Sequence, residues 1–428
     1  MTDRTADMLP ALRSYRIPGL NLGDDLVYPQ YTGRSILNIP TTICRILGVP
    51  ELGTEPLSAE ILSAIGSGYR RVLLIVMDAL SLQRFQRWLA EGRLPSWERL
   101  IRDGLLMPLT SITPSTTAAA LTTLWTGRSA AEHGITGFEM WLKEYGIVAN
   151  MIAHRPITYS GGGGSLINAG FNSQTFIPGP PLGTHLAAHQ IPTFVFQHYA
   201  IMNSGLSQMF FRDVELQSFS TATDLWINAR EVLERRAGEP LYAYVYWSEV
   251  DTFSHRYGPD TDYPAAEMAS FGAALESLFL SRLSPAARQG TLMLLIADHG
   301  QITTRRDPHY ELSSHPGLLR RLHIFPTGEN RLVYFYIRPG QTEAVHEYIQ
   351  RTWPQQFSLV DPQYAADSGL FGPGERHPQL LERLGDLIAV AHGDAYLWWS
   401  GKENHMVGRH GGLHPEEMLV PLFAMPLT

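Results

Sequence analysis

The chain has 428 residues, of which 33 are basic and 41 acidic, giving a formal net charge of −8. A hydrophobic fraction of 44% beside 17% charged residues is typical of a globular protein and excludes a disordered chain. The acidic balance, without a run of like charges, argues against non-specific nucleic-acid binding and against a basic membrane patch. Because Cys44 is the single cysteine among 16 histidines, any bound metal must be held by histidine and carboxylate.

The first 20 residues mix charged with apolar side chains and lack the apolar core of a signal peptide. No stretch of the sequence approaches the ~18 consecutive apolar residues of a membrane-spanning helix. We therefore expect a cytoplasmic protein with no membrane partner. Nucleic acid is expected only as a substrate, and the sequence leaves the oligomeric state open.

Residues 1–66 are rich in proline and glycine, which predicts an irregular N-terminal wrap with a helix near Ala59–Ile65. Further along the chain, helical patterns cover Leu80–Leu89 and Ala265–Leu283. Three short apolar runs lie among these patterns, and each leads into an acidic residue. The runs and their acids are Val72–Met77 with Asp78, Tyr242–Trp247 with Asp251, and Leu292–Ala297 with Asp298.

Apolar runs of this length, bounded by polar residues, predict strands that are buried on both faces. Their alternation with helices predicts a three-layer α/β/α fold with a largely parallel central sheet. Ligands of such sheets bind beyond the carboxyl ends of the strands. The three aspartates fall at that edge, where a functional site is expected.

A small β-α-β pattern follows Asp298. It consists of a strand over Arg331–Arg338, a helix over Thr342–Thr352 and a strand over Phe357–Val360. We expect residues 305–383 to form an inserted α+β cap on the core.

The core then comprises residues 67–304 and 384–428. Within its second part, the apolar segment Arg383–Ala391 is expected to return to the core as a strand.

Histidines accompany the aspartates in patterns that suit metal binding. Asp298 is followed directly by His299, and Asp251 precedes His255 by four residues, which puts both side chains on one face of a helical turn. His410 lies in a glycine-rich loop. Each pattern taken singly also has a structural explanation, as a turn or a helix cap.

The segment Thr113–Gly127 places three hydroxyl residues, Ser115, Thr116 and Thr117, at the start of an alanine-rich helix after Pro114. An ordinary serine or threonine N-cap would explain it. The functional alternative is a hydroxyl held at a helix N-terminus, where the dipole and free N–H groups favour an alkoxide and a phosphate oxygen.

The order of these motifs along the chain resembles the alkaline phosphatase superfamily, and within it the type I phosphodiesterase/nucleotide pyrophosphatase family. The resemblance runs from about Val72 to Leu422, and His133-Gly134 is a further family-like landmark. The segment His410–Pro421 also resembles phosphoesterase-like domains of phage-defence systems. A non-catalytic binding module of a defence system is therefore an alternative to an enzyme.

The resemblance implies a two-metal phosphoesterase. One metal would be held by Asp78, Asp298, His299 and the oxygen of Thr117, and the second by Asp251, His255 and His410. Zinc is the expected metal and manganese a possible one, given the histidine and carboxylate ligands.

Counting back from Thr126-Gly127 in the family pattern selects Thr117 as the nucleophile, with Thr116 as the fallback. The implied substrates are small phosphodiesters or nucleotide pyrophosphates, cleaved through a covalent phospho-threonine intermediate. A phosphomonoesterase or a phosphonate hydrolase of the same superfamily would use the same residues.

Overall fold

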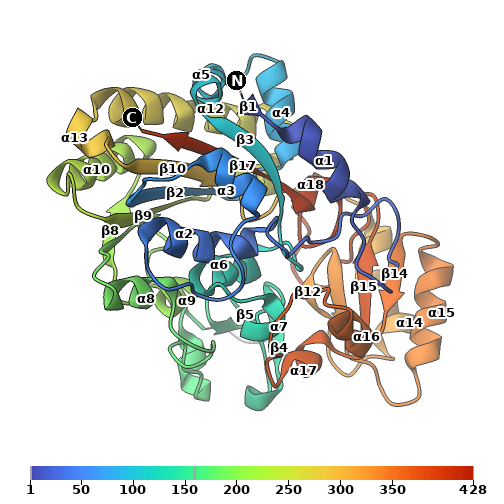
Figure 1. Ribbon diagram of the computed structural model, residues 1–428. Coiled ribbons are helices and arrows are strands. Elements are labelled where there is room, and N and C mark those ends of the chain that lie inside the picture. Colours follow the sequence, from blue (N-terminus) through green and yellow to red (C-terminus); the bar gives the residue numbers. More distant parts are fainter. Residues whose placement is uncertain (1, 158–160, 428) are drawn as a thin grey trace.

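The computed structural model describes residues 2–157 and 161–427 and contains two large β-sheets (Figure 1). The larger sheet forms the centre of the molecule, and the smaller one lies beside it. None of the helices in the described residues is long and apolar enough to cross a membrane.

The central sheet has eight strands, and all neighbours pair in parallel except that β17 is antiparallel to both β3 and β10. The predicted, largely parallel sheet is therefore confirmed. In spatial order the strands are β1 (Thr2–Asp3), β3 (Leu105–Thr110), β17 (Leu419–Pro426), β10 (Thr291–Ile296), β2 (Arg71–Met77), β9 (Leu241–Trp247), β7 (Thr193–His198) and β8 (Glu215–Phe219).

The three predicted apolar strands are β2, β9 and β10, which lie next to one another and are buried at every residue. Each begins one residue before the apolar run. In β2 that residue is Arg71, whose guanidinium is fully buried but donates to the carbonyl oxygens of Ala287, at 2.6 Å, and Leu233, at 2.8 Å. These bonds allow a charged residue to start a core strand.

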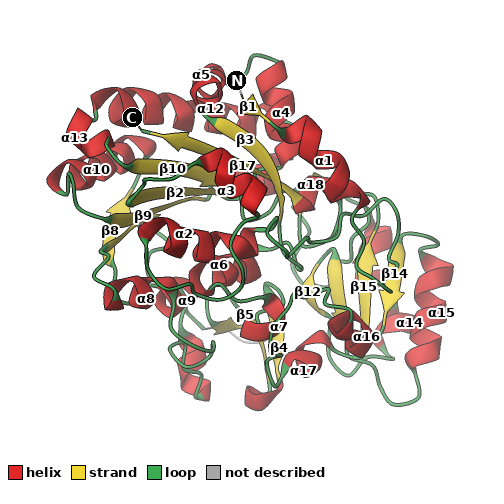
Figure 2. Cartoon of the chain, in the orientation of Figure 1, coloured by secondary structure: helices red, strands yellow, loops and turns green. Residues whose placement is uncertain are grey.

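Helices cover both faces of the central sheet, as the three-layer prediction requires (Figure 2). The helices α5, α10 and α12 lie on one side and α2, α6, α8 and α9 on the other (Figure 1). The helices of this part are α1 (Thr5–Ser14), α2 (Ile39–Leu47), α3 (Ala59–Ile65), α4 (Leu82–Ala90), α5 (Pro95–Asp103), α6 (Thr117–Thr126), α7 (Ala130–His133), α8 (Leu182–Ala188), α9 (Gly205–Phe210), α10 (Ala222–Arg235), α11 (Glu249–Tyr257), α12 (Asp262–Ala274), α13 (Pro285–Arg288) and α18 (Pro415–Met418).

The N-terminal region is more regular than its proline and glycine content predicts. The expected helix at Ala59–Ile65 is α3, but α1 and α2 are additional helices, and β1 extends the central sheet. Pro40 lies in the first turn of α2, where its missing N–H costs no hydrogen bond. Proline content therefore overstated the irregularity of this segment.

The second sheet has seven strands, and every pair in it is antiparallel. Its order is β14 (Phe357–Val360), β15 (Leu387–Ala391), β13 (Leu332–Phe335), β12 (Thr327–Glu329), β4 (Glu139–Leu142), β5 (Ile147–Asn150) and β6 (Arg155–Pro156). The helices beside it are α14 (Pro316–Leu319), α15 (Thr342–Thr352), α16 (Pro362–Asp367) and α17 (Leu380–Leu384).

The prediction assigned one strand to the wrong sheet. The segment expected to return to the core contains β15, which pairs with β13 and β14 in the second sheet and not with the central one. The predicted β-α-β unit is present as β13–α15–β14, with β15 between its two strands.

The physical reason is that β15 has a hydrophobic core on each face. Ile388 and Val390 pack into the main core, whereas Leu387, Ala389 and Ala391 pack into a second core under α15. A strand buried on both faces has the same apolar sequence pattern in either sheet, so the sequence could not tell the two sheets apart.

Candidate metal centre

The aspartates predicted to mark the site lie at the carboxyl ends of three adjacent strands. Asp78 follows β2, Asp298 follows β10, and Asp251 lies in the first turn of α11, which begins two residues after β9. The pairing of β11 (Ile302–Thr303) with β16 (Gly408–Arg409) brings the loop that carries His410 to the same edge.

The first group consists of Asp78, Asp298 and His299, whose ligand atoms all lie within 4.8 Å of one another. His299 Nε2 is 3.5 Å from Asp78 Oδ1 and 3.5 Å from Asp298 Oδ2. It is also 3.1 Å from the hydroxyl oxygen of Thr117, at the N-terminus of α6. Two carboxylates and one hydroxyl thus lie around His299 Nε2.

The second group consists of Asp251, His255 and His410, again with ligand atoms within 4.8 Å of one another. Asp251 Oδ1 is 3.2 Å from His255 Nε2 and 3.8 Å from His410 Nε2. The two groups adjoin, because the rings of His299 and His410 stack with centroids 4.0 Å apart. The structure therefore brings all seven residues singled out in the sequence to one place, in two groups.

Backbone carbonyl groups orient the three imidazole rings. Because a carbonyl oxygen only accepts a hydrogen bond, each ring Nδ1 carries a proton, and Nε2 is the ring atom that faces the cluster and can bind a metal when it is unprotonated. The Nδ1 contacts are His255 with Gly408 O at 2.8 Å, His299 with Gly300 O at 2.9 Å, and His410 with Ser115 O at 3.2 Å.

Two buried carboxylate oxygens without hydrogen-bond partners indicate that the site suits a cation. Asp78 Oδ1 and Asp298 Oδ2 have no hydrogen-bond partner among the described residues, although both are buried. Their sister oxygens are satisfied: Asp78 Oδ2 by the hydroxyl of Tyr246, and Asp298 Oδ1 by backbone N–H groups. Leaving a carboxylate oxygen buried and unpaired is costly, so the residues fit a metal ion with oxygen and nitrogen ligands.

The electrostatics of the metal-free cluster lead to the same conclusion. Burial, together with the charges of Asp298 and Asp251, raises the pKa of Asp78 well above its usual range, and burial also raises the pKa of Asp298. Burial opposes ionisation of Asp251 too, but the neighbouring imidazoles outweigh it and lower that pKa. A divalent cation would remove the conflict among the buried carboxylates.

The three hydroxyl residues before and at the start of α6 have different partners. Ser115 Oγ donates to the carbonyl oxygen of Gly412, at 2.7 Å. Thr116 is the N-cap and its side chain contacts Glu329. Of the three side-chain hydroxyls, that of Thr117 lies against a metal-ligand candidate, His299, whereas Ser115 contacts His410 through its backbone oxygen.

Three polar residues near the cluster were not identified from the sequence. The hydroxyl of Tyr246 donates a hydrogen bond to Asp78. Gln301 Nε2 donates to Asp251 Oδ1, at 2.9 Å. Tyr246 and Gln301 lie close in the sequence to the motif aspartates, which is only a weak indication that they belong to the site. Glu329 comes from β12 of the second sheet, and nothing in the sequence pattern pointed to it.

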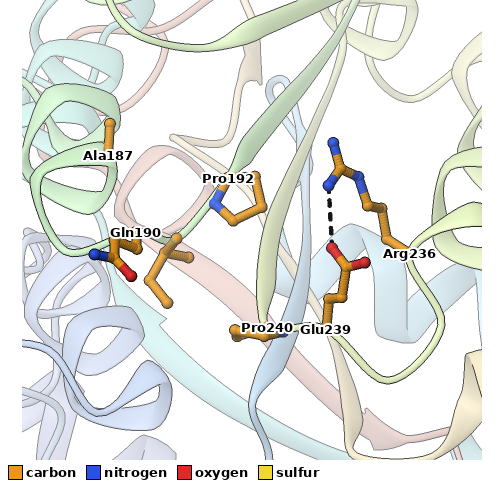
Figure 3. Close-up of a pocket in the computed structure, with 7 residues that line it drawn as sticks. Ala187, Gln190, Pro192, Arg236, Glu239 and Pro240 are labelled. Carbon is orange, nitrogen blue, oxygen red and sulfur yellow. Dashed lines mark hydrogen bonds and ion pairs between the residues drawn. The ribbon is translucent and has the colours of Figure 1, made fainter.

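A surface cavity of about 410 Å³ lies at the opposite edge of the central sheet, beside the amino ends of β7 and β9 (Figure 3). It is flanked by an ion pair of Arg236 and Glu239, 3.0 Å apart. None of the seven residues of the metal centre lines it. Its chemistry is therefore separate from that of the aspartates.

Burial raises the pKa of Glu329 to about 8, although its carboxylate accepts the N–H of Phe138 at 2.7 Å. The folded state favours the neutral carboxyl, whose ordinary pKa is 4.5. Its contribution to stability is therefore fully present below pH 4.5 and is lost as the pH rises through about 8.

We predict that Glu329→Gln removes this pH dependence. As the pH rises from 5 to 9, the metal-free wild type should lose more free energy of unfolding than the metal-free variant, by on the order of 3 kcal/mol. Urea unfolding at several pH values measures the difference. The exposed Glu375→Gln is the control and should stay parallel to the wild type, and parallel curves for Glu329→Gln would contradict the prediction.

Comparison with known proteins assigns the chain to a family. Residues 72–413 match the family model described as type I phosphodiesterase/nucleotide pyrophosphatase. A search of curated proteins finds no match.

Solved structures share the fold at low identity. Murine ectonucleotide pyrophosphatase/phosphodiesterase 5 has 16% identity and a TM-score of 0.60, over 82% of this chain and 87% of that one. Phosphonoacetate hydrolase from Sinorhizobium meliloti 1021, in complex with phosphonoformate, has 16% identity and a TM-score of 0.57, over 84% and 90%. Because the family model spans most of its length, the chain belongs to the type I phosphodiesterase/nucleotide pyrophosphatase family, and it is a hydrolase of phosphoester bonds.

Proposed function

We propose that this protein is a two-metal phosphoesterase that cleaves phosphodiester or nucleotide pyrophosphate bonds through a covalent phospho-threonine intermediate at Thr117. One observation carries the proposal. Five separate segments of the chain bring two adjacent groups of metal-ligating side chains together, with the Thr117 hydroxyl 3.1 Å from His299 Nε2.

Each of the two groups would hold one metal ion. Asp78, Asp298 and His299, with the Thr117 oxygen, would hold one metal, and Asp251, His255 and His410 would hold the other. Two divalent cations bound there, zinc in preference to manganese, would lower the pKa of the hydroxyl and offset the charge of the phosphoryl group.

The chain's own residues supply the geometry of the reaction. Thr117 heads α6, a helix of 10 residues, so phosphoryl oxygens beside it face free backbone N–H groups and the positive end of the helix dipole. The Thr117 oxygen forms a bond to phosphorus while the bond to the leaving oxygen breaks on the opposite side. Water then attacks the same phosphorus, the bond between phosphorus and the Thr117 oxygen breaks, and a proton from the water restores the Thr117 hydroxyl.

The solved relatives support both the nucleophile and the substrate class. An inactive threonine-to-alanine variant of the murine phosphodiesterase 5 was solved in complex with AMP, so one threonine is needed for the activity of that protein, and a nucleotide binds to it. Phosphonoacetate hydrolase, solved with phosphonoacetate, favours phosphonate cleavage as the second candidate function.

We predict that Thr117→Ala lowers kcat on bis-p-nitrophenyl phosphate by about 10³-fold or more, because the intermediate needs this oxygen. The fold and the metal content should stay nearly unchanged. Thr116→Ala, which alters the neighbouring hydroxyl, is the matched control and should keep most of the activity. Wild-type rates in Thr117→Ala, or a greater loss in Thr116→Ala, would refute the assignment.

We predict that Asp298→Asn and His410→Ala each lose about one equivalent of zinc, since each removes a ligand of a different group. Elemental analysis of the purified protein measures this without an activity assay. His405→Ala is the control, because His405 is an exposed histidine close to His410 in the sequence. Two full equivalents in both ligand variants would contradict the proposed sites.

We predict that the zinc-loaded protein hydrolyses bis-p-nitrophenyl phosphate faster than p-nitrophenyl phosphate or phosphonoacetate. A preference for the monoester would identify a phosphomonoesterase, and a preference for phosphonoacetate a phosphonate hydrolase. Absence of turnover on all three, with zinc and with manganese, would favour a non-catalytic binding module.

A further inference from the structure

The hairpin formed by β12 and β13 belongs to the second sheet and packs against the loop that carries His410. Its two-residue tip, Asn330-Arg331, follows Glu329, which is paired with Leu332 across the hairpin. Neither Glu329 nor Arg331 is one of the metal-ligating candidates. Both contact the segments that carry those candidates.

Arg331 forms a buried ion pair with Glu417 of α18, and both side chains are fully inaccessible to solvent. Arg331 Nε lies 2.9 Å from Glu417 Oε1. The guanidinium also donates to the carbonyl oxygens of Gly393, at 3.0 Å, and Ala395. This arginine therefore links the second sheet to a helix of the central domain.

Glu417 in turn holds the loop that carries His410. Its Oε1 accepts the N–H of Gly412 at 2.9 Å, and its Oε2 accepts the N–H of His414 at 3.1 Å. Its backbone oxygen accepts the N–H of Gly300, the residue after His299, at 2.7 Å. A single residue thus fixes one segment from each metal group.

The two glycines after His410 leave no space between this loop and the hairpin. Gly411 has φ of +109°, and a Cβ there would lie 2.3 Å from Glu329 Cβ. A Cβ on Gly412 would lie 2.9 Å from Glu417 Oε2. The hairpin therefore packs directly against the backbone of the His410 loop.

We propose that Arg331 and Glu417 are positioning residues for His410, so that the hairpin of the second sheet sets the affinity of the second metal group. The inference rests on the proposed function, because it takes His410 to be a metal ligand. The physical basis is that groups behind a metal ligand fix its orientation, and that removing one partner of a buried ion pair leaves the other charge uncompensated.

The test uses the full-length protein and measures zinc affinity by competition with a chelator, together with the thermal unfolding midpoint. Glu417→Gln keeps the size of the side chain but removes the charge and one acceptor oxygen. It should weaken binding of one of the two zinc ions at least about tenfold and leave the other within about twofold. His410→Ala identifies the affected ion, because it should remove the same binding event.

A double variant separates positioning from stability. Arg331→Met combined with Glu417→Gln removes both charges, so the unfolding midpoint should recover relative to Glu417→Gln. The weakened zinc affinity should persist, since the bonds from Glu417 to the loop are still altered. Recovery of affinity together with stability would show a merely structural pair and would overturn the inference.

The exposed ion pair of Arg99 and Glu276 provides the control, and Glu276→Gln should bind both ions as the wild type does. A folded Glu417→Gln protein with two wild-type affinities would refute the inference alone. If this variant does not fold, Arg331→Lys replaces it, with the same selective loss expected. A wild-type protein that binds fewer than two ions would refute the proposed function, and the inference with it.

Discussion

Burial of three carboxyl groups at one edge of a parallel sheet is the constraint on which the rest of this structure depends. β10, β2 and β9 are neighbours, so the acids that follow them meet. Without a cation, burial and mutual repulsion drive the pKa of Asp78 well above its usual range. Two carboxylate oxygens in that cluster have no partner among the described residues. A bound cation would compensate this arrangement, so the site and the fold depend on each other.

The metal-ligand candidates also constrain the shape of the loops around them. Each of the three rings is held through Nδ1 by a backbone carbonyl, so the loops must keep a fixed shape for Nε2 to face the cluster. For His410 that shape depends on Gly411 and Gly412, which are clamped between Glu329 and Glu417. The second sheet is thus part of the metal centre's support, although it provides none of the seven ligand candidates.

The sequence predicted the elements whose signal is local. The buried strands β2, β9 and β10 were visible as apolar runs, and their following acids marked the site edge, because parallel strands bring their carboxyl ends together. The placement of β15 was wrong, since its partners are set by tertiary pairing and a strand buried on both faces has no distinguishing pattern. Glu329 and Arg331 were missed for a related reason: their partners, Thr116 and Glu417, lie far away in the sequence, and no local pattern encodes such a contact.

Continuity of the chain through α6 shows why the second sheet and the nucleophile candidate are mechanically linked. Thr117 begins α6, and the chain passes from its end through α7 directly into β4 of the second sheet. His133 at the end of α7 hydrogen-bonds back to Thr123 of α6 at 3.1 Å, and burial lowers the pKa of His133 to about 3, so it is neutral at physiological pH. The helix is therefore tied to the metal centre at its N-terminus and to the second sheet beyond its C-terminus. Because a displacement of about 1 Å in a reacting group is enough to slow catalysis strongly, an anchor at both ends of α6 suits the proposed attack by the Thr117 oxygen.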